Sequence, residues 1–273
     1  MAVRCTPESL YLQYQSHKIH YILFGSGEKL LLCFHGFGES AFNFSVLQPS
    51  LKNIYRVVSI DLPFHGLTQW HQQFFSKSDL KNILNLFSNQ FGQKKFSLMG
   101  FSLGGKIVIG AVNEMPELIE EIFLISPDGL RNNIWYNLAI YPAWGRKLFL
   151  HMVKHPQKYF AAARFLAWLR IIPKALNKFL ETQLETEAKR QFSFDMWYCI
   201  KDFDTDVKTA RGLLNQFQIH SYLFFGEYDK VIKPIIGKKF VKGLANTQLI
   251  ILSKGHHLVK EYLNHEITKA LNR

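Results

Sequence analysis

The sequence predicts an α/β fold with a mostly parallel, eight-stranded sheet and helices on both faces. Strand-like apolar runs alternate with helical patterns along most of the 273 residues, and this alternation is typical of a parallel sheet covered by helices. The run at 29–34 is apolar almost without interruption, as expected of a strand buried on both sides. Glycines and polar residues follow several runs, at the carboxyl ends where such sheets collect ligand groups.

The strands are expected where short apolar runs lie between turn signals, such as the glycines of 25–27. In chain order, the expected strands cover residues 10–14, 18–24, 29–34, 55–60, 95–99, 121–126, 219–225 and 248–252.

The helices are expected where apolar residues recur every three or four positions. Such patterns cover about 77–91, the segment that follows Gly105, and about 234–244. A further helix is expected to carry Phe42, Val46 and Leu47. The last helix is expected to bury one side, formed by Leu258, Val259, Tyr262, Leu263 and Ile267.

The alternation stops after Gly129, and residues 130–207 show helical patterns without a convincing strand. From Arg131 through Leu180 there is no Asp or Glu, but there are nine Lys or Arg. We therefore expect a helical cap at 130–207, inserted into an α/β core that comprises residues 1–129 and 208–273. Before residue 180, the cap segment also contains three of the five tryptophans, Trp135, Trp144 and Trp168.

A serine stands between glycines in Gly100-Phe-Ser-Leu-Gly-Gly105, after the strand at 95–99 and before a helix. This G-x-S-x-G pattern is that of a nucleophile elbow, a strained turn that lifts the hydroxyl of Ser102 above the edge of the sheet. Larger side chains at the glycine positions would collide in so tight a turn. The N-terminus of the following helix favours negative charge that develops there.

A nucleophilic serine needs a base within hydrogen-bond reach, and the base needs an anion that orients it. Candidate groups follow four other strands: the segment 35–38, Asp128, Asp229 and His256. The order Ser102, Asp229, His256 supplies the nucleophile, the acid and the base in the chain order of one hydrolase architecture.

Together these motifs resemble the α/β-hydrolase superfamily, and in particular its cap-bearing, mostly cytoplasmic members. The resemblance implies that Ser102 is the nucleophile, that His256 is the general base and then the acid, and that Asp229 orients His256. It also implies an oxyanion hole made of the backbone N–H groups of Leu103 and Phe37. The expected reaction is hydrolysis of a carboxylic ester or a related acyl bond. The motifs that carry the resemblance are His35-Gly-Phe-Gly38, Asp61-Leu-Pro-Phe-His-Gly66, Gly100-Phe-Ser-Leu-Gly-Gly105, Gly226-Glu-Tyr-Asp229 and Gly255-His256.

Some assignments have alternatives. Asp128 could be the orienting acid, because some members of the superfamily carry the acid one strand earlier. His257 could replace His256, but the residue directly after the glycine is the family position, and we expect His257 to begin the last helix. The remaining polar residues of the motifs, Asp61, His65 and His35, are expected to structure their loops.

Three other functions fit parts of the sequence. A hydrolase of carbon–carbon bonds in diketone-like substrates would use the same triad, and a non-catalytic member of the fold would only bind a ligand or partner. The segment from Gly36 to Ala41 also fits the dinucleotide pattern G-x-G-x-x-A, with Asp61 as the ribose acid of an NAD-dependent oxidoreductase. That interpretation leaves the elbow and the Gly255-His256 segment unexplained.

The net charge of +12 and the pI near 9.5 favour anionic partners, but no nucleic-acid motif accompanies them. The aromatic, acid-free cap suits the apolar part of a small acyl substrate. Its basic residues could face an anionic head group or a lipid surface, although we favour a hydrophobic cap–core interface with a solvated basic exterior. Neither a secretory signal nor a membrane-spanning stretch is found.

The cysteines indicate a reducing, cytoplasmic setting. Cys5, Cys33 and Cys199 are an odd number with wide spacing, and no zinc-ligand spacing is present. We expect neither a metal nor a cofactor, and the mechanism implied by the motifs requires none.

Overall fold

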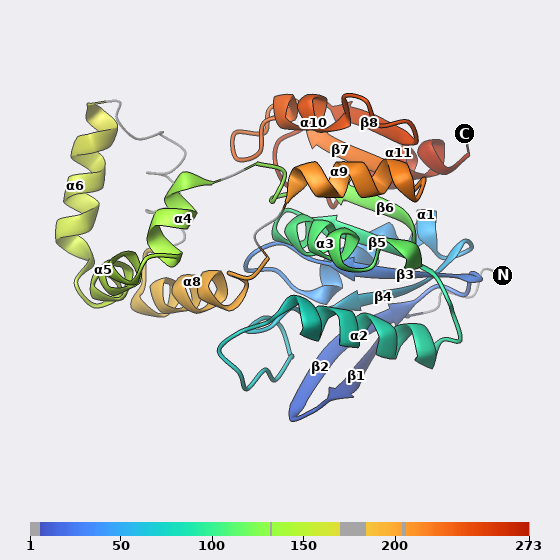
Figure 1. Ribbon diagram of the computed structural model, residues 1–273, viewed down its shortest axis with the longest axis horizontal. Helices are drawn as coiled ribbons and strands as arrows, with labels where there is room; N and C mark the ends of the chain where they lie inside the picture. Colours follow the sequence, from blue (N-terminus) through green and yellow to red (C-terminus); the bar gives the residue numbers. More distant parts are fainter. Residues whose placement is uncertain (1–5, 132, 170–183, 204–205, 273) are drawn as a thin grey trace. The chain divides into compact units, whose positions relative to one another are not determined.

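The computed structural model in Figure 1 describes residues 6–131, 133–169, 184–203 and 206–272. The expectations for Cys5 and for cap residues 170–183 lie outside the described residues. The chain forms two compact units. The core unit comprises residues 1–71, 75–131 and 203–273, and the helical unit comprises residues 72–74 and 132–202.

The core unit contains one eight-stranded sheet in the order β1-β2-β4-β3-β5-β6-β7-β8. β1 pairs with β2 and β2 pairs with β4 in antiparallel fashion, while all other neighbours are parallel. The predicted mostly parallel sheet is therefore confirmed. The strands are β1 (Glu8–Tyr14), β2 (His17–Phe24), β3 (Lys29–Phe34), β4 (Tyr55–Ile60), β5 (Phe96–Phe101), β6 (Ile119–Ile125), β7 (His220–Gly226) and β8 (Thr247–Leu252).

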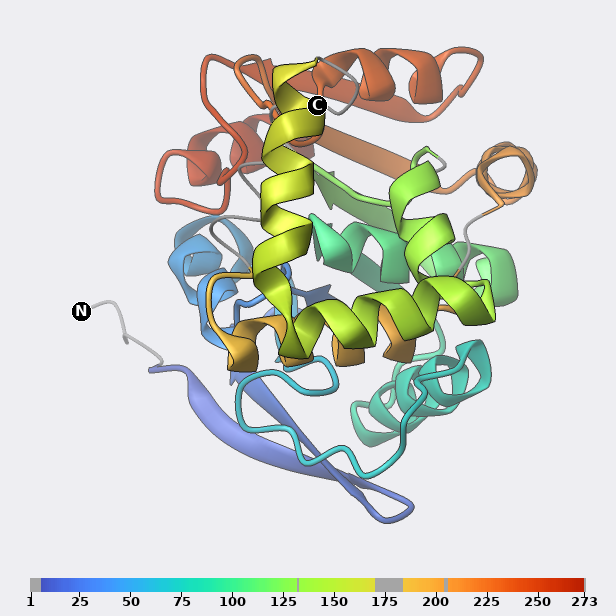
Figure 2. The ribbon, with the colours of Figure 1, turned by 90° about the vertical axis from the view of Figure 1, so that its left-hand side faces the viewer.

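Helices cover both faces of this sheet, as predicted (Figure 2). The 3₁₀ segment η1 (Ala41–Leu47), α1 (Gln48–Leu51) and α11 (Leu263–Leu271) lie on one face. On the other face lie α2 (Lys77–Gln90), α3 (Leu103–Glu114) and α9 (Val207–Gln216), while η2 (Pro116–Leu118) precedes β6 and α10 (Pro234–Val241) packs against β7 and β8.

Apolar periodicity explains how the helices pack. In α11, Leu263, Ile267 and Ala270 repeat every three or four residues, so one side of the helix joins the buried cluster around Phe44 and Met99. At the start of α2, Ser76 and Asp79 form a capping box in which each side chain bonds the other's backbone N–H. Sequence and packing therefore agree on these two helices.

Two helix predictions needed correction. Residues 41–47 form a 3₁₀ segment, and the Ser45 hydroxyl bonds the Phe42 carbonyl, a local contact that competes with regular α-helix. The last helix begins at Leu263, so the prediction that His257 begins it is wrong. Leu258 is fully buried as expected, but it lies in a loop. Buried residues in a loop can match helical spacing, and here that spacing misplaced the helix start.

The predicted insertion of helices between the sixth and seventh strands is confirmed by α4 (Ile134–Ile140), α5 (Ala143–Lys154), α6 (Pro156–Trp168) and α8 (Glu187–Cys199). The insertion has no strand within its described residues, and no helix of the described ranges is long and apolar enough to cross a membrane. The helical unit has its own small core, formed by Tyr136, Ile140, Phe149, Val153 and Phe194.

A buried arginine also organises the helical unit. Arg190 of α8 is 6% exposed and donates hydrogen bonds to the carbonyl oxygens of Val153, Leu184 and Glu185. These bonds tie α8 to the end of α5 and to the chain that leads into α8.

Candidate active site

The serine of the elbow lies at the turn between β5 and α3. Ser102 has φ 49° and ψ −112°, a backbone conformation that a residue with a side chain adopts only under strain. Three backbone hydrogen bonds hold it there: its N–H donates to the Ile125 carbonyl at 3.0 Å, and its carbonyl accepts from Gly105 at 2.9 Å and Asp128 at 2.8 Å. The neighbouring strand end therefore fixes the turn.

The glycine before the serine is required by close packing. A Cβ atom on Gly100 would lie 2.4 Å from the carbonyl oxygen of Gly104, closer than side-chain atoms approach backbone. Only glycine lets β5 pass so near the first turn of α3. The steric reason given for the G-x-S-x-G pattern is confirmed at this position.

The structure brings Ser102, His256 and Asp229 together at the carboxyl ends of β5, β8 and β7. Nε2 of His256 lies 3.1 Å from the Ser102 hydroxyl oxygen, and Nδ1 of His256 lies 2.7 Å from Oδ2 of Asp229. Both distances are within hydrogen-bond range. A proton on Nδ1 that is donated to Asp229 leaves Nε2 as the atom that accepts the serine proton.

The carboxylate of Asp229 is buried, and both of its oxygens are hydrogen-bonded. Its side chain is inaccessible to solvent, and Oδ1 accepts hydrogen bonds from the N–H groups of Val231 and Ile232, both at 2.8 Å. Burial alone would raise the pKa of Asp229. The hydrogen bond and charge of His256, with the two backbone donors, outweigh burial and lower the pKa below its usual value of 3.8. Asp229 is therefore an anion at neutral pH.

The alternative residues make other contacts. One carboxylate oxygen of Asp128 accepts from the N–H of Gly129 at 2.8 Å, so this side chain bonds its own turn. The side chain of His257 is 74% exposed and lies 3.7 Å from Glu39. Geometry therefore favours Asp229 over Asp128, and His256 over His257, as the partners of Ser102.

The two expected oxyanion donors occupy defined backbone positions. Leu103 is the first residue of α3, where a backbone N–H has no acceptor within the helix. Phe37 lies in the loop after β3. On either side of Phe37, the N–H of Gly36 donates to Glu39 at 3.1 Å and that of Gly38 donates to Nε2 of His65 at 3.0 Å. Side chains thus hold the loop that presents Phe37.

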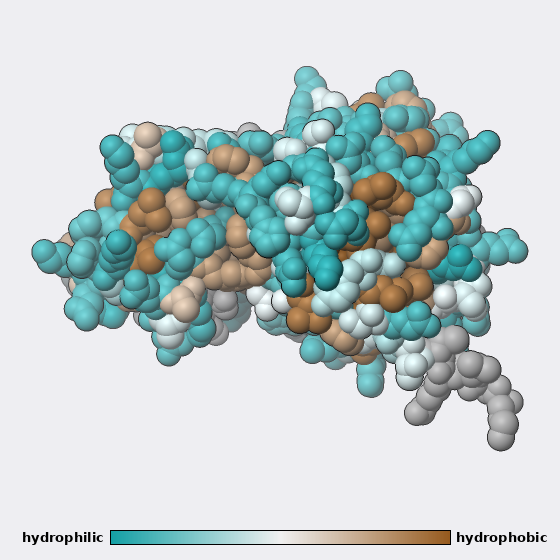
Figure 3. Space-filling view, turned by 90° about the horizontal axis from the view of Figure 1, so that it is seen from below, coloured by the Kyte–Doolittle hydropathy of each residue, from teal (hydrophilic) through white to brown (hydrophobic). Residues whose placement is uncertain are grey.

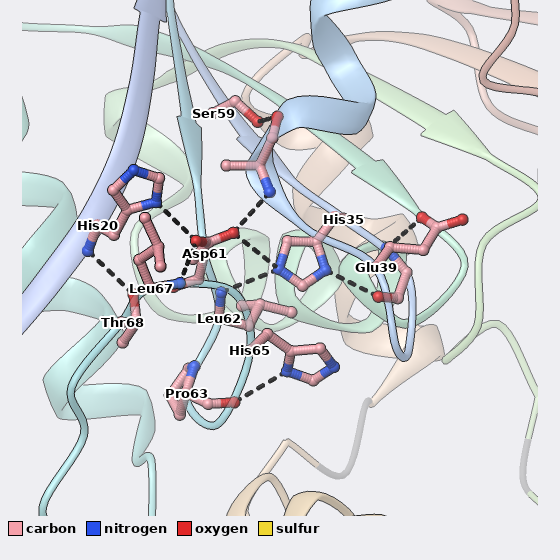
Figure 4. A network of polar contacts seen from close by, with 12 residues as sticks. His20, His35, Glu39, Ser59, Asp61, Leu62, Pro63, His65, Leu67 and Thr68 are labelled. Atoms are coloured by element: carbon pink, nitrogen blue, oxygen red, sulfur yellow. Dashed lines mark hydrogen bonds and ion pairs between the residues drawn. The ribbon is translucent and has the colours of Figure 1, made fainter. Parts of the chain in front are cut away.

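A buried carboxylate lies beside His35 at the start of this loop (Figure 4). Asp61 is 1% exposed and follows β4. Its Oδ1 accepts from the N–H of Ala41 at 2.6 Å, while Oδ2 accepts from Leu67 at 2.8 Å and from Nδ1 of His20 at 2.6 Å. A Cβ atom on Gly66 would lie 1.8 Å from Oδ2, so only glycine leaves room for this carboxylate.

Two buried histidines complete the network (Figure 4). In His35, Nδ1 donates to the Gly36 carbonyl and Nε2 accepts from the N–H of Leu62. Burial and then the charge of His65 lower the pKa of His35 to about 3, against weaker opposing effects of Gly36 and Asp61. Burial likewise lowers the pKa of His65. Both rings are neutral at pH 7, and the expected loop-structuring role of Asp61, His35 and His65 is confirmed.

Sequence reasoning missed two members of the network. His20 lies on β2, is fully buried, and bonds Asp61 through Nδ1, while its Nε2 lies 2.8 Å from the Ser9 hydroxyl. A lone histidine in a strand gives no sequence signal for such a partner. The side chain of Glu39 accepts a hydrogen bond from the N–H of Gly36, three residues earlier in the chain. That short spacing could have identified Glu39 as a residue that holds the loop.

The dinucleotide interpretation is contradicted by these contacts. Both oxygens of Asp61 are buried and bonded within the protein, so they do not face a ribose. The segment after the glycines is the 3₁₀ segment η1, whereas the dinucleotide fold places the first turn of a long α-helix there.

The described part of the chain contains no group of three His, Cys, Asp or Glu that could hold a metal ion. Cys33 and Cys199 are both buried, and burial raises the pKa of the Cys33 thiol.

Comparison with known proteins identifies the family. The family model described as alpha/beta hydrolase fold matches residues 29–262 of this chain. The chain belongs to the α/β-hydrolase fold family. This α/β-hydrolase is 25% identical over 246 residues to a protein of Bacillus subtilis named uncharacterized hydrolase YugF, and the match covers 86% of the chain and 85% of that protein.

Two further relatives span nearly the whole α/β-hydrolase chain. This protein is 25% identical to the pimeloyl-[acyl-carrier protein] methyl ester esterase of Legionella pneumophila, and the match covers 90% of this chain and 94% of that enzyme. The crystal structure of a hydrolase from Pseudomonas aeruginosa superimposes with a TM-score of 0.67 at 18% identity and covers 97% of this chain and 99% of that one. The structural likeness shows the shared fold, and the family and the names of the relatives support a hydrolytic enzyme.

Proposed function

We propose that this protein is a serine hydrolase that cleaves a carboxylic ester or a related acyl bond through a Ser102-His256-Asp229 triad. The observation that carries the proposal is the continuous hydrogen-bonded chain from the buried Asp229 carboxylate through His256 to the Ser102 hydroxyl. These hydrogen bonds connect the three groups that acyl transfer requires: a nucleophile, a base and an anion that orients the base.

The reaction follows from this geometry. Nε2 of neutral His256 takes the hydroxyl proton as Oγ of Ser102 attacks the carbonyl carbon of the substrate. The imidazolium then gives that proton to the leaving alkoxide, and an acyl-enzyme remains. His256 next takes a proton from water, the hydroxide attacks the acyl carbon, and the proton returns to Ser102 as the carboxylic acid leaves. The Asp229 anion stabilises the imidazolium in both steps.

The oxyanion is assigned to the backbone N–H groups of Leu103 and Phe37. Leu103 supplies its donor from the first turn of α3, and the loop of Phe37 is braced by the contacts of Gly36 and Gly38. Each such donor typically contributes about 10²–10³-fold to the rate.

The ester specificity rests on the relatives and on the cap. The Legionella relative is named as a methyl ester esterase, which favours an oxygen ester over a carbon–carbon bond as the target. We propose that residues 130–207 act as a cap and that their aromatic residues accept the apolar part of the substrate. A cytoplasmic location, suggested by the odd number and wide spacing of the cysteines, is part of the same proposal.

The test is turnover of p-nitrophenyl acetate by the unaltered protein and by Ser102→Ala. We expect Ser102→Ala to abolish turnover and to lose labelling by a fluorophosphonate probe, with an unchanged circular dichroism spectrum. Ser97→Ala is the matched control, because Ser97 is a buried serine near the opposite end of the same strand. Turnover retained by Ser102→Ala would contradict the proposal. Absence of both labelling and turnover in the unaltered protein would instead indicate a non-catalytic binding protein.

A further inference from the structure

The helical unit exposes apolar side chains along one side of α5. Gly145, Phe149 and Val153 are buried, whereas Trp144 and Leu148 on the opposite side are exposed. Trp144 is 59% exposed, although a tryptophan ordinarily contributes much of its large apolar area to a core or an interface. This helix therefore has apolar residues on both sides, only one of which serves the core of the unit.

The next helix is still less buried. None of the side chains of α6 is buried, and its exposed side carries Phe165 and Trp168, whose rings stack with centroids 6.0 Å apart. Trp168 is 75% exposed, and Leu169 just beyond the helix is also exposed. A helix with so much apolar surface and so little burial needs another apolar environment.

The two helices contact one another. Nδ1 of His151 in α5 lies 2.8 Å from the hydroxyl oxygen of Tyr159 in α6, which couples them. Figure 2 shows α5 and α6 in front of α8, and Figure 3 shows brown hydrophobic residues among the teal surface of the helical unit. We define the α5–α6 surface by its exposed apolar residues, Trp144, Leu148, Phe165, Trp168 and Leu169.

Exposed basic side chains lie on the same two helices as this apolar surface, and these helices contain no acidic residue. Lys147, Lys154, Lys158 and Arg164 are exposed on the same two helices, and none of them forms an ion pair with a described residue. No Asp or Glu occurs anywhere in residues 133–169. Aliphatic stems of lysine and arginine extend an apolar surface while their charged ends reach outward.

We propose that the α5–α6 surface binds the surface of an anionic lipid bilayer. Exposed tryptophan and phenylalanine beside lysine and arginine, on a helix face without acids, is the composition of helices that lie in the membrane interface. The rings and leucines enter the boundary between head groups and acyl chains, and the basic ends contact lipid phosphates. The charge complementarity selects this occupant, because a second copy of the chain would bring the same positive charge against itself.

The test is co-sedimentation of the full-length protein with vesicles of phosphatidylcholine alone or mixed with an equal part of phosphatidylglycerol. We expect binding to the mixed vesicles at physiological salt, weaker binding at high salt, and little binding to phosphatidylcholine alone. The Ser102→Ala chain is expected to bind equally, so the outcome does not depend on hydrolysis.

Surface variants locate the contact. Phe165→Ser combined with Trp168→Ser is expected to weaken binding at least about tenfold, since it removes the stacked rings. Lys147→Gln combined with Lys154→Gln should weaken it about 25-fold, at about fivefold for each charge. The controls alter exposed residues of the core unit: Phe217→Ser for the aromatic pair, and Lys81→Gln with Lys269→Gln for the charges.

Circular dichroism and the thermal midpoint show whether each variant is folded. The proposal is overturned if the unaltered protein does not bind the mixed vesicles, or if the core-unit controls lose as much binding as the surface variants. It is equally overturned if the unaltered chain is a dimer that Phe165→Ser and Trp168→Ser dissociate, because a second copy would then cover this surface.

Discussion

The buried carboxylate of Asp229 lies against Nδ1 of His256, so Nε2 is the ring nitrogen that faces the serine. Its two backbone donors and its contact with Nδ1 keep it ionised despite burial. An amide at this position could keep both backbone contacts through its oxygen, but its NH2 group would then present a donor to Nδ1. The charge that stabilises an imidazolium would also be lost.

Asp229→Asn is therefore expected to lower kcat for p-nitrophenyl acetate by about 10³–10⁴-fold, with little change in KM. The matched control is Asp128→Asn, since Asp128 bonds only its own turn among the contacts described for its side chain. Steady-state kinetics of both variants provide the measurement. A large loss in Asp128→Asn with near-normal turnover in Asp229→Asn would assign the acid to the earlier strand.

The triad candidates could be found from sequence because each follows a strand end. In a parallel sheet these ends lie at one edge, so Ser102, Asp229 and His256 are near one another whatever the loop details. His20 could not be found in this way. It lies within β2, and its partner Asp61 is 41 positions away in sequence, so only the pairing of β2 with β4 brings the two together.

At the scale of elements, the loop after β3 depends on two neutral histidines. His35 and His65 each use one ring nitrogen as an acceptor for a backbone N–H, Leu62 and Gly38 respectively. Protonation would turn each acceptor into a donor that faces another donor. The loop that presents Phe37 should therefore lose its support when either ring becomes charged.

This arrangement predicts a loss of stability in acid. The folded-state pKa of His35 is about 3, below the usual 6.5, so between these values the unfolded chain binds a proton that the folded chain does not. The contribution is complete above pH 6.5 and declines as the pH falls towards 3, by up to about 1.4 kcal/mol per pH unit. Urea unfolding at a series of pH values measures this slope.

His35→Gln isolates the effect of this ring. It should lower stability at pH 7 and give a shallower decline below pH 6.5 than the unaltered protein, because the residue no longer titrates. His220→Gln is the control, since His220 is exposed at the start of β7. If His35→Gln kept the full acid slope, another group would have to cause it.

The error at the start of the last helix comes from apolar residues in the loop before it. Apolar spacing reports which side chains are buried, and it was correct for Leu258 and Leu263. It does not report whether the backbone between them is helical. Short turns at Leu258 to Lys260 and at Lys260 to Leu263 precede α11 and deliver His256 to its partners. The backbone therefore turns between Leu258 and Leu263, where the spacing predicted a helix.

At the scale of the whole molecule, charge is divided unevenly between the units. Residues 132–202 contain eleven Lys or Arg and five Asp or Glu, a net +6 of the total +12. About a quarter of the chain thus carries half of the net charge. The family match spans both units, from residue 29 to 262, but the composition of the helical unit differs from that of the core unit.

The proposed role of the cap predicts a preference for longer acyl chains. Each methylene group that leaves water contributes about 0.8 kcal/mol, or about fourfold in kcat/KM when fully buried in the transition state. We expect kcat/KM for p-nitrophenyl hexanoate to exceed that for the acetate by at least about tenfold, since partial burial of the chain suffices. Assays below the critical micelle concentration, with Ser102→Ala as the blank, measure this ratio. Equal values for the two esters would mean that the aromatic residues of the cap do not contact the acyl chain.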